Sequence, residues 1–275
     1  MAWGKVKNIM ILLLLLVNAF LLVLVGMRQG ESHRYQDAAL TQAIGVLEQN
    51  GIQVEAQSLG SAQGLYPQLM ERDLVRERAL AAALLGEEVE PENQGGGLYR
   101  YLGSRGQVSI RAGGELSAQL NPDASWHTQD PQAQAAALLE DMGVEARQID
   151  AQLDRGTGMV RFFQLWQGQP LFSCQVVFTY EQGRLTGLEG TLLAANSGQG
   201  TEQGQTITLP TALLRFLDAV VRGGEVCSQI TAMQPGYLTA QSFSGSVSLA
   251  PAWRIGSDTA DYYLDAVTGE VTRVR

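Results

Sequence analysis

Histidine and cysteine are scarce in this sequence, which holds two of each among its 275 residues. No second histidine or cysteine lies at metal-ligand spacing from His33 or His127, which argues against a zinc site. Cys174 and Cys227 are too few for the disulfide framework of a small secreted domain, although one bridge between them stays open. We therefore expect neither a metal nor another cofactor.

Lysine is also nearly absent, and its two positions are informative. Lys5 and Lys7 are the only lysines, so the remaining cations are 19 − 2 = 17 arginines. All 28 acidic residues follow residue 30, which leaves the main part of the chain with a formal balance of 17 − 28 = −11. Such a surface repels nucleic acid, so we expect no nucleic-acid partner.

Motifs of known catalytic sites are missing. No G-x-S-x-G elbow follows a strand, and no glycine-rich phosphate loop carries its lysine. The acidic run Glu87–Glu92 is typical of a solvated segment, and the aspartates Asp258, Asp261 and Asp265 flank a hairpin, where aspartate favours turns. We therefore expect a binding or regulatory protein without enzyme activity.

Hydrophobic residues are concentrated near the start of the chain. The segment Ile9–Val25 has no charged residue, and with Gly26 and Met27 it is long enough for a helix across a bilayer. A cleaved signal peptide is the alternative, but its apolar core would be about 7–15 residues long and followed by a small-x-small cleavage site. We expect an uncleaved transmembrane anchor over Ile9–Met27.

Residues beside and within this segment predict the orientation of the anchor and a contact with a partner helix. Lys5 and Lys7 precede it and favour a cytoplasmic N-terminus, with the rest of the chain outside the cell. Asn18 is the polar side chain inside the segment, where its amide either hydrogen-bonds a partner helix or is tolerated alone. In the first case Leu12 and Leu16 would supply the packing.

Three later segments repeat a pattern of helix followed by strand. Apolar residues at i, i+3, i+4 and i+7 predict amphipathic helices at 36–50, 131–142 and 210–222. Hairpins rich in β-branched and aromatic residues, with glycine turns, follow each helix. Each helix ends at a glycine that can adopt the left-handed conformation, namely Gly51, Gly143 and Gly223. The pattern predicts an α+β fold of repeated helix-on-antiparallel-sheet units.

The predicted organisation follows from these segments. It places the cytoplasmic end at 1–8, the anchor at 9–27, a first αβ unit at 31–122, and a second part at 123–275 with units at about 123–200 and 205–275. Glu87–Gly97 and Asn196–Gln205 are glycine-rich without periodicity, which is typical of linkers.

The N-terminus resembles a known family. Met1-x-Trp3-x-Lys5-x-Lys7, followed by a leucine-rich helix with Asn18-Ala19-Phe20-Leu21-Leu22, is similar to the YycH/YycI family, and to its YycI branch in layout. These single-pass membrane proteins of Gram-positive bacteria regulate the WalK-type sensor histidine kinase that controls cell-wall metabolism. The resemblance implies a kinase partner contacted through membrane helices, a second YycH-like protein as a further partner, and no catalytic residues.

The C-terminus resembles a different element. Pro251–Ile255 and Tyr262–Val271 are similar to the last hairpin of PepSY-like domains, in which a tryptophan strand pairs with a strand ending in D-A-x-T-G-E-V. Gly269 can take the positive φ of the turn. We expect a membrane-anchored extracytoplasmic regulator of a two-component system. The alternatives are a PepSY-like module that binds or restrains a secreted peptidase, and a cell-wall hydrolase.

Overall fold

The computed structural model describes most of the chain after residue 34. The described residues are 10, 14, 17, 18, 35–62, 64–86, 89–121, 123, 126–195, 199–200, 206–241 and 246–274.

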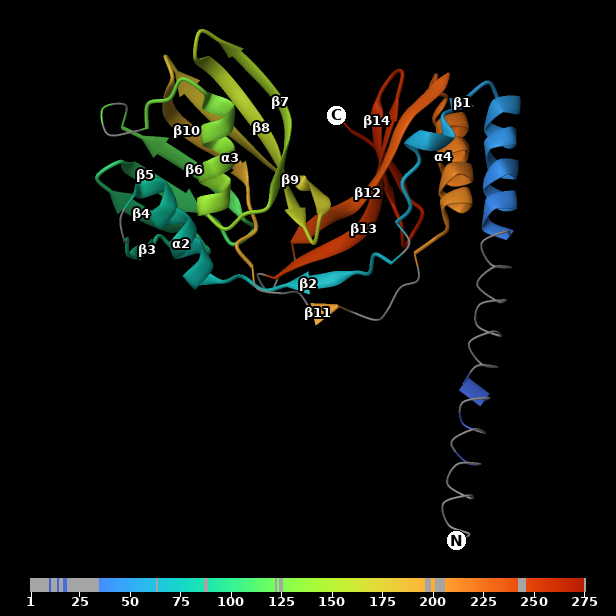
Figure 1. Ribbon diagram of the computed structural model, residues 1–275, viewed down its shortest axis with the longest axis horizontal. Helices are drawn as coiled ribbons and strands as arrows, with labels where there is room; N and C mark the ends of the chain where they lie inside the picture. The colour runs from blue at the N-terminus through green and yellow to red at the C-terminus, as the bar shows by residue number, and fades with distance from the viewer. Residues whose placement is uncertain are drawn as a thin grey trace.

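The described residues form a mixed α+β fold with four α-helices and a large sheet (Figure 1). Helix 35–49 is followed by β1 (Gln53–Val54), a 3-10 turn (Ala56–Ser58), β2 (Gln68–Met70), α2 (Leu74–Leu85), β3 (Pro91–Asn93), β4 (Tyr99–Gly103), β5 (Gly106–Ile110), β6 (Glu115–Leu120), α3 (Pro131–Asp141), β7 (Ala146–Asp154), β8 (Thr157–Trp166), β9 (Gln169–Glu181), β10 (Arg184–Thr191), β11 (Gln199–Gly200), α4 (Leu209–Gly223), β12 (Gln229–Gln241), β13 (Val247–Ser257), β14 (Asp261–Asp265) and β15 (Val271–Arg273).

The strands divide between two lobes. Lobe A contains β3 to β10 with α2 and α3, and lobe B contains β1 and β12 to β15 with helix 35–49 and α4 (Figure 1). β12 pairs in parallel with β1 and with β9, whereas the other pairings between named strands are antiparallel. The predicted α+β fold with mainly antiparallel strands is confirmed at this level.

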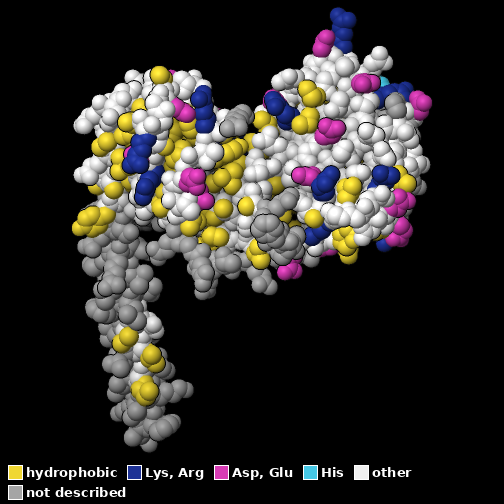
Figure 2. Space-filling model, turned by 180° about the vertical axis from the view of Figure 1, so that it is seen from behind, with side chains coloured by type: hydrophobic (Ala, Val, Ile, Leu, Met, Phe, Trp, Pro, Cys, Tyr) yellow, Lys and Arg dark blue, Asp and Glu magenta, His cyan; other side chains and the backbone are white. Residues whose placement is uncertain are grey.

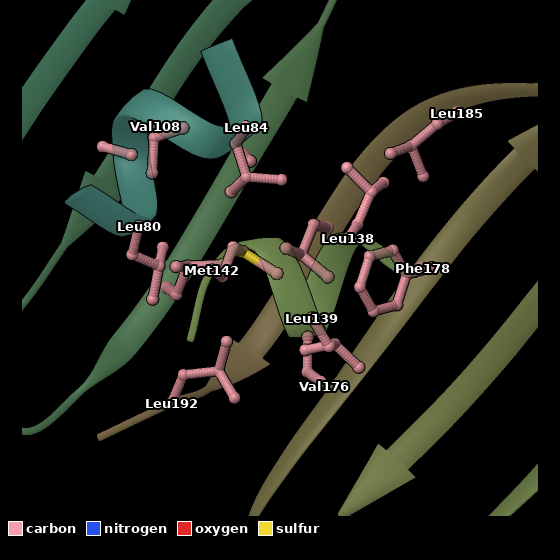
Figure 3. Packing of buried hydrophobic residues seen from close by; sticks show 14 of the residues in the cluster. Leu80, Leu84, Val108, Leu138, Leu139, Met142, Val176, Phe178, Leu185 and Leu192 are labelled. Carbon is pink, nitrogen blue, oxygen red and sulfur yellow. The ribbon is translucent and has the colours of Figure 1, made fainter. Parts of the chain in front are cut away.

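Capping residues define where the helices of lobe A begin. The side chain of Asp73 accepts hydrogen bonds from the N–H groups of Val75 and Arg76, which caps α2. Asp130 caps α3 through Ala133 N–H. Apolar residues of both helices pack on β5, β9 and β10 (Figure 3), and this cluster includes Leu80, Leu84, Val108, Leu138, Leu139, Met142, Val176, Phe178 and Leu185. Burial on this scale supplies the main stabilisation of lobe A.

Lobe B joins the two ends of the described chain. Ala43 and Leu47 of helix 35–49 belong to the same buried cluster as Phe216 of α4 and Trp253 of β13. Figure 1 shows the two helices side by side on one face of the sheet. The clusters therefore join segments from both sides of residue 122, and the predicted unit boundaries at 31–122, 123–200 and 205–275 stay a prediction.

The lobes meet where β2, β9, β12 and β13 come together. β2 pairs with β13 at three residue pairs, and β9 pairs with β12 at Leu171 and Tyr237. Cys174, Leu249 and Met70 are buried in the small cluster between them. Gly236 permits this crossing, because a Cβ there would lie 2.5 Å from the carbonyl oxygen of Pro170.

The predicted helices 36–50, 131–142 and 210–222 are confirmed within two residues at each end. The prediction of a structureless Glu87–Gly97 is wrong in part, because β3 within it pairs with β4. The predicted linker Asn196–Gln205 lies largely outside the described residues.

Within the part of the chain that the structure describes, no helix has both the length and the apolar character needed to cross a membrane. The predicted anchor Ile9–Met27 lies mostly outside that part and stays a prediction.

Replacing Gly236 by alanine is expected to lower the free energy of unfolding by about 1–3 kcal/mol, because the added methyl group meets Pro170 and the ring of Phe172. Urea unfolding followed by fluorescence measures this change. Gly45→Ala is the control: a Cβ at Gly45 meets no atom within 4 Å, and alanine in a helix stabilises by about 0.5–1 kcal/mol. If both variants changed the free energy of unfolding equally, the close approach of Gly236 to Pro170 would be contradicted.

Candidate functional site

The residues predicted to contact a partner lie near the N-terminus. Asn18 is helical and exposed, so its amide is accessible in this structure. Leu12, Leu16, Lys5 and Lys7 lie outside the described residues, and their predicted roles in packing and orientation stay predictions.

A second group of polar and aromatic side chains connects the lobes. Phe172 of β9 stacks on Tyr263 of β14, with 5.5 Å between ring centroids. Phe163 of β8 meets Phe172 edge to face at 6.3 Å. Arg254 of β13 lies over the ring of Phe163, with 5.7 Å from its Cζ to the centroid. We call these four residues, together with Asp261, the seam.

The seam is partly accessible and carries paired charge. The guanidinium of Arg254 donates to Asp261 through Nε at 3.1 Å and Nη2 at 2.5 Å. Both side chains remain about one-third exposed. Burial raises the pKa of the Tyr263 phenol above its ordinary value. Arginine and tyrosine side chains of this kind are enriched at the energetic centres of protein contacts.

The seam lies between the two lobes. Figure 2 shows a notch between the two lobes. In the described ranges no three His, Cys, Asp or Glu side chains gather where they could hold a metal ion. The seam thus presents aromatic rings and one arginine–aspartate pair.

One charged pair lies inside lobe A. Arg72 binds Glu77 through two hydrogen bonds, Nε to Oε1 at 2.5 Å and Nη2 to Oε2 at 2.7 Å, and Glu77 is only 2% exposed. Arg72 also donates to the carbonyl oxygen of Gly97 at 2.6 Å and lies over the ring of Tyr99. Burial raises the pKa of Glu77, and the hydrogen bonds and charge of Arg72 oppose that rise. This pair ties α2 to the loop before β4.

Of the aspartates near the C-terminal hairpin, Asp265 lies in a turn as predicted, whereas Asp258 binds a residue before β12. Asp258 accepts hydrogen bonds from the N–H and hydroxyl groups of Ser228, and these bonds lower its pKa. Asp265 accepts from the N–H groups of Val267 and Thr268 in the turn before Gly269, whose φ is 75°.

Neither cysteine is engaged in a disulfide. Cys174 is buried between the lobes, whereas Cys227 precedes β12 and is partly exposed. Burial raises the pKa of the Cys174 thiol to about 12, so the reactive thiolate is nearly absent there. The bridge that the sequence left open is therefore not formed in this structure.

The chain matches no protein-family model and no curated protein. Among solved structures it is similar to an uncharacterized protein from Eubacterium rectale, at 10% identity and a TM-score of 0.48 over 82% of this chain and 90% of that one. It is also similar to the Bacillus megaterium YpeB C-terminal domain, at 11% identity and a TM-score of 0.40 over 74% of this chain and 99% of that one. Likeness at this level is weak and carries no conclusion about function.

Sequence reasoning missed the seam and the Arg72–Glu77 pair. One signal was available: Arg254 interrupts the apolar run Ala252–Ile255, and a cation at a half-buried strand position needs a partner. Nothing comparable marks Phe163 or Phe172, because aromatic residues in strands are typical of any core.

In the native protein we expect iodoacetamide to modify Cys227 and to leave Cys174 intact, because Cys174 is buried and its pKa is about 12. Peptide mapping by mass spectrometry distinguishes the two thiols, and unfolding in urea should expose both. Equal rates of modification in the native protein would contradict the burial of Cys174.

Replacing Glu77 by glutamine is expected to lower the free energy of unfolding by about 3–5 kcal/mol, because it leaves the Arg72 charge buried without its partner. Glu90→Gln is the matched control: Glu90 also binds an arginine, Arg78, at 2.5 Å, but its side chain is 79% exposed. We expect about 0–1 kcal/mol for this surface pair. Urea unfolding of both variants tests the difference, and similar losses would show that burial of Glu77 adds nothing.

Proposed function

We propose that this chain is a membrane-anchored extracytoplasmic regulator of a two-component system that controls cell-wall metabolism. It acts by contact with a sensor histidine kinase, with a second YycH-like protein as a further partner. In this proposal the N-terminus is cytoplasmic, the anchor crosses the cell membrane once, and both lobes lie outside the cell.

The observation that carries the proposal is Asn18 within an uncharged segment of membrane-spanning length. An amide in the bilayer gains from a partner helix that can hydrogen-bond to it. Its exposure leaves it available for such a contact. Leu12 and Leu16 would pack beside it, and Lys5 and Lys7 would hold the end of the segment at the negatively charged inner leaflet.

The roles of the ionisable side chains support contact over catalysis. Glu77 and Asp261 bind arginines, Asp258 binds Ser228 before β12, and Asp265 organises a turn. Cys174 is buried with a raised pKa. Each of these five groups has a structural role or is buried, which leaves none of the five free for acid-base or nucleophilic chemistry.

A second proposal, a PepSY-like module that restrains a secreted peptidase, is favoured by the C-terminal hairpin. Trp253 is fully buried and its Nε1–H donates to the carbonyl oxygen of Gly60 at 2.9 Å. β13 and β14 pair as the resemblance implies. Copurification from detergent-solubilised membranes separates the two proposals, because one requires a histidine kinase and the other a peptidase.

Replacing Asn18 by leucine is expected to weaken association with the kinase by about 3- to 30-fold, because the interhelical hydrogen bond is lost. Membrane insertion should persist, since leucine is more apolar than asparagine. Val17→Leu is the control, because it changes the neighbouring position without removing a polar group. Copurification with the kinase, normalised to the amount in membranes, measures the difference.

An anchor exchange tests the same proposal more strictly. A fusion of residues 28–275 to an unrelated single-pass anchor should lose regulation of the kinase. If the fusion regulated as well as the native chain, the lobes would carry the contact and the role given to Asn18 would be wrong.

A further inference from the structure

Exposed apolar side chains gather in one short stretch that joins the lobes. Tyr66, Leu69, Leu74 and Val75 are all exposed, although they flank the buried Met70 and the Arg72–Glu77 pair. They lie on and beside β2 and in the first turn of α2. We call them the ridge. Single exposed apolar residues are common, but four within ten successive residues of a folded surface call for a partner.

The ridge lies on a particular side of the molecule. Figure 1 shows β2 and the beginning of α2 along its lower side, and helix 35–49 also begins toward that side. Hydrophobic side chains are visible along the same lower margin in Figure 2. Tyr35, the first residue of helix 35–49, is exposed as well.

The chain outside the lobes indicates what covers this side. Only 34 − 27 = 7 residues separate the predicted anchor from Tyr35. Seven residues span at most about 25 Å when fully extended, so this side of lobe B stays close to the bilayer surface. Tyrosine and leucine side chains are suited to the membrane interface, where apolar atoms leave water and the hydroxyl stays hydrated.

We propose that the ridge lies against the outer surface of the membrane and inserts its side chains among the lipid headgroups. This inference rests on the proposed single-pass anchor, but not on the kinase partner. Charge does not drive the contact. The exposed Glu71 and the Asp73–Arg76 pair give the ridge no positive surplus, and the main part of the chain is acidic overall. Insertion should therefore occur in neutral phosphatidylcholine and persist in high salt.

Two valines provide a matched test. Val75 in the ridge and Val226 after α4 are both 77% exposed, and Figure 1 shows α4 ending at the side of lobe B away from β2. Each is replaced by cysteine in the full chain with Cys227→Ser, since Cys174 is buried and unreactive. A nitrobenzoxadiazole label on each thiol then reports its surroundings after reconstitution into phosphatidylcholine vesicles that carry doxyl-labelled lipid.

The label at residue 75 should show a blue shift and lose emission to the doxyl lipid, whereas the label at residue 226 should do neither. Flotation of the vesicles is measured in the same samples. Flotation with equal, negligible quenching at both positions would overturn the ridge contact and leave the anchor standing. Failure to float would overturn the anchor and the ridge contact together.

A protein occupant is tested by adding solubilised membrane proteins during reconstitution. If the residue 75 label is shielded from aqueous iodide only when they are present, and is never quenched by lipid, a protein covers the ridge and the lipid proposal is wrong. The double variant Leu74→Ser, Val75→Ser provides a further measurement. It should keep the far-ultraviolet spectrum of the native chain and lose shielding of a label at residue 69.

Discussion

The arrangement of this molecule depends on one shared hydrophobic core, formed by segments from the two ends of the described chain. Ala43 and Leu47 near its start are buried with Phe216, Trp253 and other residues near its end. Lobe A is consequently a long insertion between helix 35–49 and α4. Loss of the N-terminal helix would expose the face of lobe B that it covers, so folding of lobe B requires residues from both ends of the chain.

Two different kinds of contact connect the N-terminal helix to lobe A. The first is between helix 35–49 and lobe B, and the second is between lobe B and lobe A. Helix 35–49 is joined to lobe B by an apolar core, whereas lobe A is joined to lobe B by short ladders, a small buried cluster and the seam. An apolar core resists small displacements more than a short ladder does. A regulator changes its partner only if its contacts differ between the partner's states. The joint between the lobes is the place where the described structure can most easily supply such a difference, because it rests on short ladders and a small buried cluster.

The sequence predicted the features that depend on neighbouring residues, such as helix ends. It did not predict the contacts between segments far apart in the chain. Asp130, Pro131 and Gly143 define α3 almost to the residue, because capping and termination depend on neighbours in the chain. β12 runs through Pro235 and Gly236, although neither residue is typical of a strand interior. The structure uses that glycine for the close crossing over Pro170, which no local pattern encodes. Likewise, the run from Glu71 to Arg78 has the charge pattern of a solvated helix, and the burial of Glu77 follows only from the position of Arg72 under the loop at Gly97.

The acidic surplus and the ridge act in opposite directions at a membrane surface. A formal balance of −11 repels the lobes from anionic lipid, but that repulsion falls off over about 8 Å at physiological salt. Apolar contact acts only at the interface itself, in proportion to the area removed from water. In the proposed arrangement the chain needs no basic patch to lie on the bilayer, because the proposed anchor would supply proximity and the ridge would select the side that faces the lipid.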